Sequence, residues 1–335
     1  MKALFIGGTG NISTPCTQLA LEKGFEVTLL NRGQTHNHEP IPGAKVIQAD
    51  IRRPEEVERA LAGQNFDVVV DWIAFTPEHI ENDIRLFSGK TGQFIFISSA
   101  SIYQSPPAYP IITESTPLAN PFWEYSRNKI ACEERLNEAY RAEDFPMTII
   151  RPSHTYNTMI PVAIGGGSTV VDRIRRGVPV VVPGDGTSLW TLTHSDDFAK
   201  AFVGVMGHPQ ALGEAFHITS DEVLTWNQIY EIIGQAVGVK PHVVHIPTDL
   251  IALLGTGEGA GLLGDKANSV IFDNSKIKRL VPEYVATIPF HQGIRRTLSW
   301  FDADPSRHKV DPKSNQFLDR CLAAYQKALD AATLE

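Results

Sequence analysis

Short, nearly continuous apolar runs alternate with helix-like stretches through the first 152 residues, and this alternation limits the folds open to the chain more than any other feature. The apolar runs read KALFIG, FEVTLL, AKVIQAD, FDVVVDWIA, GQFIFISSA and FPMTIIRP, with helical patterns such as PEEVERALA and HIENDIRLF between them. Strands that are apolar on both faces are typical of a parallel sheet covered by helices on each side. The sequence therefore predicts an α/β fold with a doubly wound parallel sheet.

The rhythm changes after Pro152, where glycine and proline become frequent in stretches such as AIGGGST and LLGTGEGAGLLGD. We expect residues 1–152 to form the sheet domain. Residues 153–305 are expected to form mostly a smaller α/β domain, interleaved with the last strands of the first. A helical segment is expected over 306–335, because Asn315 to Ala332 carries apolar residues at helical spacing that would dock on the body.

Composition argues against several classes of protein. The formal net charge of −8 disfavours a nucleic-acid partner, and no apolar run is long enough to cross a membrane. Three widely spaced cysteines without a CxxC pair fit a reducing compartment rather than a disulfide scaffold. No His, Cys and Asp cluster has metal-ligand spacing, and THNH at 35–38 is interpreted as a polar loop. The opening MKALFIGG is interpreted as a strand rather than a leader, so we expect a cytoplasmic protein.

The stretch GGTGNIS, Gly7 to Ser13, lies between the first strand and the first expected helix. Gly7 permits a tight turn, Gly10 lets a pyrophosphate approach the backbone, and Ser13 is small enough for close helix–strand packing. Such a turn also occurs without a ligand, but its place in a βαβ unit of about 30 residues favours dinucleotide binding. The predicted cofactor-binding residues of this stretch are Gly7, Thr9, Gly10, Asn11 and Ile12.

The ends of the next strands bear on the choice of cofactor. Asn31 is neutral and Arg32 could pair with a 2′-phosphate, so NADP is slightly favoured over NAD, unless Arg32 is simply a surface residue. Asp50 ends the third expected strand, where it could accept the adenine amino group or bond to its own turn. Ile51 and Ile73 complete the predicted cofactor contacts at this edge.

A distant motif, EYSRNK, places Tyr125 and Lys129 four residues apart, on one face of a helix. A tyrosine with a pKa near ~10 is a poor base at neutral pH, but a neighbouring ammonium lowers that pKa. Ser99 ends the fifth strand within SSASIY, and ligands of open α/β sheets bind at the carboxyl ends of strands. Ser99 is therefore placed to bond a substrate oxygen, or alternatively to cap its own loop.

These motifs together resemble the extended short-chain dehydrogenase/reductases of the NAD-dependent epimerase/dehydratase type. The matching segments run in family order to about residue 301 and are GGTGNIS, the Asp50 strand end, SSASIY, YSRNK, RPSHTY, GDG at 184–186, THSDD, DNSK and GIRRTLSWF. The resemblance implies a Rossmann domain over 1–152, a substrate domain over most of 153–305, and NAD(P) as cofactor. It implies that Tyr125 is the acid/base, that Lys129 contacts the ribose and that Ser99 orients the substrate, with Pro152 and Ser153 beside the nicotinamide.

Departures from the family pattern narrow the substrate. Dehydratases carry an acid pair where this chain has Ala100 and Ser101, which argues against dehydration. Nucleotide-sugar epimerases carry arginines that grip a diphosphate, and here Trp190 and Lys266 stand nearest to those places. We therefore expect a smaller or differently charged substrate than a nucleotide sugar. Its predicted contacts are Ser101, His154, Trp190 and Lys266, although Trp190 could simply be buried.

Three functions are compatible with these features. The first is an NAD(P)-dependent epimerase or oxidoreductase that acts on a carbohydrate-like hydroxyl or carbonyl of a small molecule. The second is an NADPH-dependent carbonyl reductase. The third is a non-catalytic RNA-binding member, because the chain also resembles chloroplast stem-loop RNA-binding proteins and carries the basic run RIRR at 173–176. The family resemblance also suggests a homodimer formed through a helix over Phe122 to Arg141.

Overall fold

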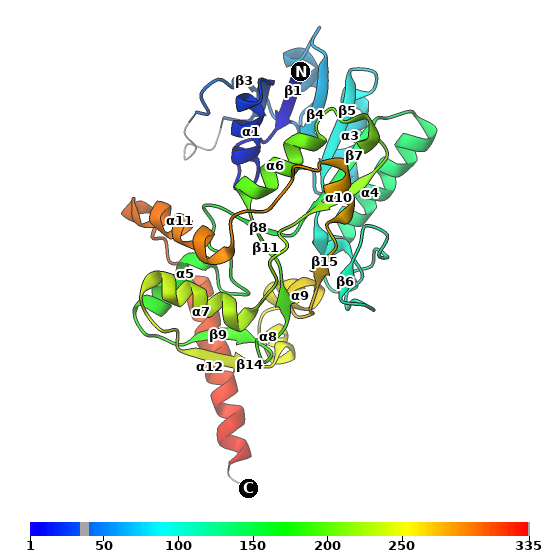
Figure 1. The fold of residues 1–335 in the computed structure, drawn as a ribbon. Coiled ribbons are helices and arrows are strands. Elements are labelled where there is room, and N and C mark those ends of the chain that lie inside the picture. Colours follow the sequence, from blue (N-terminus) through cyan, green and yellow to red (C-terminus); the bar gives the residue numbers. More distant parts are fainter. Residues whose placement is uncertain (34–39, 334–335) are drawn as a thin grey trace.

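The computed structural model describes residues 1–33 and 40–333, so THNH at 35–38 lies outside the described residues. A parallel sheet of seven strands forms the centre of the molecule, in the order β12-β7-β5-β4-β1-β2-β3 (Figure 1). Its strands are β1 (Lys2–Ile6), β2 (Glu26–Asn31), β3 (Lys45–Gln48), β4 (Phe66–Asp71), β5 (Thr91–Ile97), β7 (Met147–Pro152) and β12 (Ala215–Ile218). The predicted doubly wound α/β fold is confirmed.

Alternating side chains of the first strand show why the sheet needs helices on both faces. Ala3 and Phe5 pack with α1 (Ser13–Glu22) and α6 (Ser195–Val205) on one face. Leu4 and Ile6 pack with α2 (Pro54–Ala60), α3 (Pro77–Phe87) and α4 (Glu124–Ala142) on the other. All four side chains are fully buried, as the continuous apolar run predicted.

A second group of elements has its own apolar core below the sheet (Figure 1). Its centre is the parallel pair β9 (Val180–Pro183) and β14 (Val243–Ile246), and α5 (Gly167–Arg175), α7 (Trp226–Val237) and α8 (Thr248–Leu254) pack around it. β12 follows α5 and β9 in the chain yet joins the main sheet next to β7, so elements after Pro152 serve both groups. The boundaries at residues 152 and 305 stay predictions.

Short strand pairs and helices connect the two groups. The pairs are β8 (His154–Tyr156) with β11 (Leu192–His194), β10 (Leu189–Trp190) with β13 (Leu224–Thr225), and β6 (Ile111–Ile112) with β15 (Ile271–Phe272). The helices are α9 (Thr256–Gly261), α10 (Ser275–Leu280) and α11 (Phe290–Asp302), with short helical turns η1 (Ala100–Ile102), η2 (Pro209–Ala211), η3 (Leu262–Lys266) and η4 (Pro305–Arg307).

The final helix, α12 (Pro312–Ala332), begins three residues before the predicted Asn315. Pro312 suits a first helical position, and the Asp311 side chain accepts the N–H groups of Lys313 and Ser314, so the start is fixed by its cap. The predicted docking holds for the first half, where Phe317, Leu318 and Cys321 are buried. The second half projects away from the body, with Leu329 43% exposed (Figure 1).

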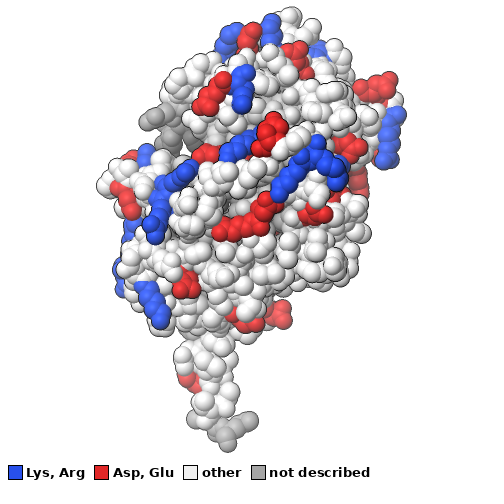
Figure 2. Space-filling model, in the orientation of Figure 1, with Lys and Arg blue, Asp and Glu red and all other residues white. Residues whose placement is uncertain are grey.

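Acidic and basic side chains are interspersed on the face seen in Figure 2 rather than gathered into one basic area. Each arginine of the RIRR run has an acidic partner, which supports a structural role for that run. The pairs are Arg173 with Asp319, Arg175 with Asp302, and Arg176 with Asp172. Among the residues that the structure describes, no helix combines the length and apolarity needed to cross a membrane.

One buried ion pair joins the sheet to α4 beside the candidate site. Arg151 of β7 donates from Nε to Glu133 Oε1 at 3.0 Å and from Nη2 to Glu133 Oε2 at 2.6 Å. Its Nη1 also donates to Tyr103 Oη at 3.1 Å. The side chains of Arg151 and Glu133 are only 6% and 1% exposed, so neither has water to replace a lost partner.

Removing one member of this pair should destabilise the fold strongly. We expect Glu133→Ala to lower the free energy of unfolding by about 3–5 kcal/mol, because it leaves the Arg151 guanidinium buried and unpaired. Urea unfolding measures the change. The control is Arg176→Ala, which removes a surface pair and should change the free energy of unfolding by no more than about 0.5 kcal/mol. Equal losses in the two variants would contradict this account.

Candidate active site

The glycine turn after β1 has a shape that only glycine allows at its first position. Gly7 has φ 84°, and a Cβ there would lie 2.8 Å from Cγ2 of Ile73. The backbone N–H of Gly10 donates to Oγ of Ser13 at 2.7 Å, and that hydroxyl donates to the Gly7 carbonyl at 3.1 Å. Ser13 therefore holds the turn together as well as providing close packing.

The N-terminus of α1 fits a pyrophosphate. Ile12 occupies the cap position and makes no side-chain cap bond. The N–H of Thr14 already donates to the carbonyl of Gly10 at 3.0 Å, and Pro15 has no N–H, so only part of the first turn is left to bind an anion. A Cβ built on Gly10 would approach only Ser13 Oγ, at 3.4 Å, so the space in front of the turn is open. Uncapped N–H groups at a helix N-terminus, next to backbone without side chains, are a general anion-binding arrangement.

The sequence predicted that Asn11 contacts the cofactor, but its side chain is engaged in hydrogen bonds within the protein. Its Nδ2 donates to the carbonyl of Thr155 at 3.0 Å. Its Oδ1 accepts the backbone N–H groups of Asn157, Thr158 and Met159 at 3.0, 3.1 and 3.3 Å. The side chain thus ties the turn to the segment after β8, which leaves Asn11 only its backbone for a phosphate.

The adenosine side of the predicted site is more open. Asn31 ends β2 and Arg32 after it is exposed, in reach of solvent. β3 ends at Gln48, two residues before the predicted end at Asp50, because Oδ1 of Asp50 accepts the N–H of Arg52 at 3.0 Å and bends the chain into a turn. Asp50 thus bonds to its own turn, while its contact with adenine stays a prediction, and Ile51 is buried beside it.

A cavity of about 310 Å³ opens at the carboxyl ends of β5 and β7. It brings together Ser99, Ser101, Tyr125, Pro152, Ser153, His154, Trp190 and Lys266, all of which the sequence singled out. Trp123, Thr191, Asp265 and Phe272 also line it, and sequence reasoning missed them. Thr191 and Asp265 are sequence neighbours of the predicted Trp190 and Lys266, and Trp123 lies two positions before Tyr125. Closeness to a motif in the sequence could therefore have identified these three, but not Phe272.

Lys129 lies beneath the cavity wall and is almost wholly buried. Its Nζ donates to the carbonyls of Ala74 at 2.7 Å and Ile97 at 2.6 Å, at the ends of two neighbouring strands. An ammonium has three donors, so one N–H is left for a further acceptor. The rings of Phe96 and Phe75 lie 4.6 and 4.9 Å from Nζ, centroid to nitrogen. Burial lowers the pKa of Lys129 to about 8.

Tyr125 differs from expectation in its protonation. Burial raises its pKa above the ordinary value, and a hydrogen bond with Ser99 only partly opposes this. The sequence had predicted a lowered pKa through Lys129, whose Nζ is 5.8 Å from the Tyr125 ring centroid. Burial is the largest cause, and the charges of Asp265 and Cys132 raise the pKa of Tyr125 further. The phenol is therefore protonated at neutral pH and can donate a proton.

The serines at the end of β5 form a chain of hydroxyls. Oγ of Ser99 lies 2.9 Å from Oγ of Ser101, which lies 2.7 Å from Oγ of the buried Ser126. Ser99 also accepts the N–H of Ser101 at 3.2 Å. The capping alternative for Ser99 is confirmed, since its side chain caps η1. Ser99 also lines the cavity with Tyr125, and its contact with a substrate oxygen stays a prediction.

His154 and Trp190 form a fixed pair at the other side of the cavity. Nε1 of Trp190 donates to Nδ1 of His154 at 3.2 Å, which makes Nδ1 an acceptor and puts the ring proton on Nε2. Trp190 is only 3% exposed and stacks on Trp226 at 5.4 Å between centroids. Burial lowers the pKa of His154 to about 3, so the ring is neutral. Trp190 is therefore buried and also at the cavity edge.

Lys266 does not act as an isolated cation. Its Nζ lies 3.8 Å from Oδ2 of Asp265 and 5.7 Å from the ring centroid of Trp123. Burial raises the pKa of Asp265, and the neighbouring ammonium opposes that rise. The pair brings both signs of charge to the cavity wall, so the pocket has no strong preference for an anion.

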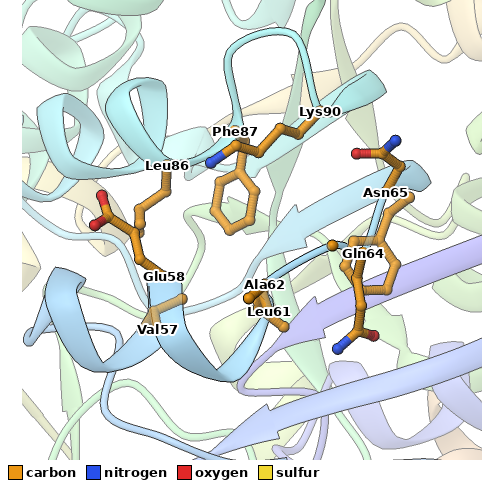
Figure 3. Close-up of a pocket in the computed structure, with 11 residues that line it drawn as sticks. Val57, Glu58, Leu61, Ala62, Gln64, Asn65, Leu86, Phe87 and Lys90 are labelled. Atoms are coloured by element: carbon orange, nitrogen blue, oxygen red, sulfur yellow. The ribbon is translucent and has the colours of Figure 1, made fainter.

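Other candidate sites carry less chemistry. Within residues 1–33 and 40–333, no group of three or more His, Cys, Asp or Glu side chains could hold a metal ion. A second cavity of about 270 Å³ lies between α2 and α3, near Leu61, Phe66, Phe87 and Lys90 (Figure 3). Phe66 begins β4 and Lys90 precedes β5, so this cavity is at the amino ends of the strands, away from Tyr125.

Residues 3–219 match the family model of the NAD dependent epimerase/dehydratase family. The match covers more than half of the chain, so the protein belongs to this family, and the resemblance read from the motifs is confirmed.

Individual relatives are distant. 2'-dehydrokanamycin reductase of Streptomyces kanamyceticus is 24% identical over 287 residues, which are 85% of this chain and 80% of that protein. The chloroplast stem-loop binding protein of 41 kDa b of Arabidopsis thaliana is 27% identical over 259 residues, 73% of this chain and 65% of that protein. An epimerase structure from Methanothermobacter thermautotrophicus has a TM-score of 0.75 at 18% identity, covering 92% of this chain and 94% of the other. That likeness shows the shared fold.

The state of His154 can be measured directly. We expect the ring to remain neutral, with its proton on Nε2, from about pH 5 to pH 9, because its pKa lies near 3 and Trp190 donates to Nδ1. Nitrogen chemical shifts of the labelled histidine report both properties. Trp190→Phe serves as the comparison, since it removes the donor and should release Nδ1. A His154 ring that gains a charge between pH 5 and pH 7 would contradict the assignment.

Proposed function

We propose that this protein is an NAD(P)-dependent oxidoreductase or epimerase that acts on a carbohydrate-like hydroxyl or carbonyl. The observation that carries the proposal is the cavity at the carboxyl ends of β5 and β7, where Tyr125 and Ser99 meet above the buried Lys129. The family match and the named reductase and epimerase relatives support it.

The residues present fit a dinucleotide. Gly7, Gly10 and the uncapped start of α1 would receive the pyrophosphate, and the free N–H of the Lys129 ammonium would reach a ribose hydroxyl. Pro152 and Ser153 line the cavity where the nicotinamide would lie. A bound nicotinamide would accept a hydride in oxidation or donate one in reduction. Arg32, exposed at the end of β2, is available to a 2′-phosphate and keeps NADP slightly favoured.

The proton chemistry follows from the chain's own side chains. Ser99 hydrogen-bonds the reacting oxygen and holds it against Tyr125. In reduction, Tyr125 gives its proton to the carbonyl oxygen, which becomes a hydroxyl, and the phenolate left behind is stabilised by the nearby Lys129 ammonium. In oxidation the same proton returns from the substrate hydroxyl to the phenolate. The protonated phenol found at neutral pH suits the reductive direction first.

The cavity also suggests the kind of substrate. Aromatic faces of Trp123 and Phe272 and the neutral His154 favour a hydroxylated ring or a similar uncharged group. The Asp265–Lys266 pair lacks the planar fork that binds a diphosphate in two-point fashion, which supports a substrate other than a nucleotide sugar. Ala100 and Ser101 stand at the cavity without a carboxyl group, which argues against dehydration.

Two alternatives have specific support. A simple carbonyl reductase is favoured by the reductase relative and by the protonated Tyr125. A non-catalytic RNA-binding role is favoured by the chloroplast relative. Against the second stand the acidic partners of the RIRR arginines, which leave that run little charge for phosphates, and a hydroxyl and phenol set that a binding protein does not need.

Tyr125→Phe tests the catalytic assignment. We expect turnover to fall by about 10²–10⁴ while NAD(P) binding is retained, because the variant keeps the ring and loses only the proton donor. Steady-state kinetics and cofactor titration measure the two effects. Tyr140→Phe is the matched control, since Tyr140 lies on the same helix but is 40% exposed. Its turnover and cofactor binding should equal those of the wild type. Near-normal turnover of the Tyr125 variant would overturn the assignment.

Mass spectrometry of the small molecule released on denaturation distinguishes epimerase from reductase. An epimerase regenerates its cofactor within each cycle, so the purified protein should carry close to one NAD(P) per chain and need none added. A reductase should release its cofactor each turnover and purify largely without it. An absence of any nicotinamide compound, together with RNA retained at low salt, would instead favour the RNA-binding alternative.

A further inference from the structure

Two buried carboxyl groups lie behind the candidate active site and take no part in the chemistry proposed above. Asp71 ends β4 and Asp83 lies in the middle of α3, and both are fully buried. Oδ1 of Asp71 accepts the N–H groups of Ile73 at 2.5 Å and Ala74 at 2.8 Å. Oδ2 of Asp71 and both oxygens of Asp83 have no N–H or hydroxyl donor among the described residues.

Asp71 acts on Asp83 through both its charge and a hydrogen bond, so the two carboxyl groups are neighbours. Three buried carboxylate oxygens without donors are costly unless one of the groups is protonated. An ionised carboxylate is only an acceptor, so two of them cannot bond to each other, and like charges at close range cannot both persist. A single proton converts one group into a donor and satisfies its neighbour at the same time. Asp83, which has no other donor, is the group to hold that proton, because Asp71 already accepts two N–H bonds that favour its charged form.

We propose that Asp71 and Asp83 share one proton, carried by Asp83 and donated to Oδ2 of Asp71, and that the Asp71 carboxylate so held is the positioning residue for Lys129. The first half stands on the burial of both carboxyl groups and on their unsatisfied oxygens, together with the charge and hydrogen bond through which Asp71 acts on Asp83. The second half rests on the proposed function, because it concerns how a ribose-binding and proton-managing lysine is placed.

A continuous set of contacts links Asp71 to Lys129. The Asp71 carboxylate holds the N–H of Ala74, and the carbonyl of Ala74 accepts from Lys129 Nζ at 2.7 Å. The same turn carries Ile73, whose side chain lies against the glycine turn and whose carbonyl accepts a hydrogen bond from Arg52 Nη2. One carboxylate thus fixes the loop that touches both the lysine and the phosphate turn.

The surrounding charges agree with one negative charge on the pair rather than two. Arg52 and Lys129 are the cations that act on it, while the pKa of His79 is lowered, chiefly by burial, so His79 is neutral at pH 7. Burial, and then the charge and hydrogen bond of Asp71, raise the pKa of Asp83 well above its usual range. From α3 and α4, Cys132 and Glu133 also act on Lys129, and Glu78 and Glu133 act on Cys132.

The shared proton can be seen by infrared spectroscopy of the full chain. We expect a protonated-carboxyl C=O band at pH 7 in the wild type, sensitive to exchange into D₂O. Asp83→Asn should fold, because its amide donates to Asp71 in place of the acid, and should lack the band. Asp265→Asn is the control for the partly exposed Asp265, whose pKa is also raised, and should keep the band. A wild type without the band, or an Asp83→Asn variant that retains it, would overturn the shared proton.

The shared proton also predicts how the free energy of unfolding of the wild type and of Asp83→Asn should change with pH. A carboxyl whose folded pKa is raised binds a proton that the unfolded chain releases, so the wild type loses stability as pH rises above the usual carboxyl range and towards the folded pKa of Asp83. Asp83→Asn should lack this loss. Urea unfolding between about pH 4 and pH 8 measures it, and parallel curves for the two proteins would count against the proposal.

The positioning role is tested through the pH dependence of cofactor binding, followed by quenching of tryptophan fluorescence with NADP and NAD. Asp71→Asn keeps the side-chain acceptor for Ala74 but removes the charge that favours the Lys129 ammonium, and Asp71→Ala removes both. We expect the alkaline loss of binding to move down by about one pH unit. An unmoved pH profile would overturn the positioning role. A wild type that binds neither cofactor would overturn the proposed function and this role with it, while the infrared result would still decide the shared proton.

Discussion

The contact on which the rest of the site depends is the ammonium of Lys129 between the carbonyls of Ala74 and Ile97. Ile97 is the last residue of β5 and Ala74 lies just after β4, so one charge from α4 joins the ends of two neighbouring strands. A buried ammonium is stable only when such acceptors are aimed at it. Because Lys129 must reach both carbonyls, the position of α4 on the sheet is fixed, and so is the position of Tyr125 on the same face of α4. The loop that carries Ala74 also carries Ile73, and the side chain of Ile73 packs against the glycine turn.

The sequence predicted the sheet, the glycine turn and most of the cavity lining, because these follow from local patterns: apolar strands, a turn that needs glycine, and motifs at strand ends. It did not predict the protonation of Tyr125, which depends on how much water the fold removes from the phenol. It also missed Asp71 and Asp83, which lie 12 positions apart in the chain and meet only when α3 packs on β4. Burial and long-range contacts are properties of the fold, and no spacing rule reports them.

Polar groups around the cavity are mostly engaged with one another. Trp190 fixes the tautomer of His154, Ser126 anchors the hydroxyl chain of Ser101, and Asp265 lies beside Lys266. Such pairing holds side chains in place before a substrate arrives and lowers the entropy lost on binding. It also lowers the net charge of the pocket. Specificity in this chain would therefore come from the shape and the direction of a few donors rather than from charge, in agreement with the missing arginine clamps.

The side chain of Asn11 has a mechanical consequence. It makes four hydrogen bonds between the turn after β1 and residues 155–159, the stretch through which the chain leaves the sheet for the lower elements. Any movement of the lower elements that widened the cavity would pull on this amide, and through it on the glycine turn after β1. The glycine turn and the lower elements are therefore mechanically coupled through Asn11. A ligand that rigidified the glycine turn would also restrict movement of the lower elements at the cavity.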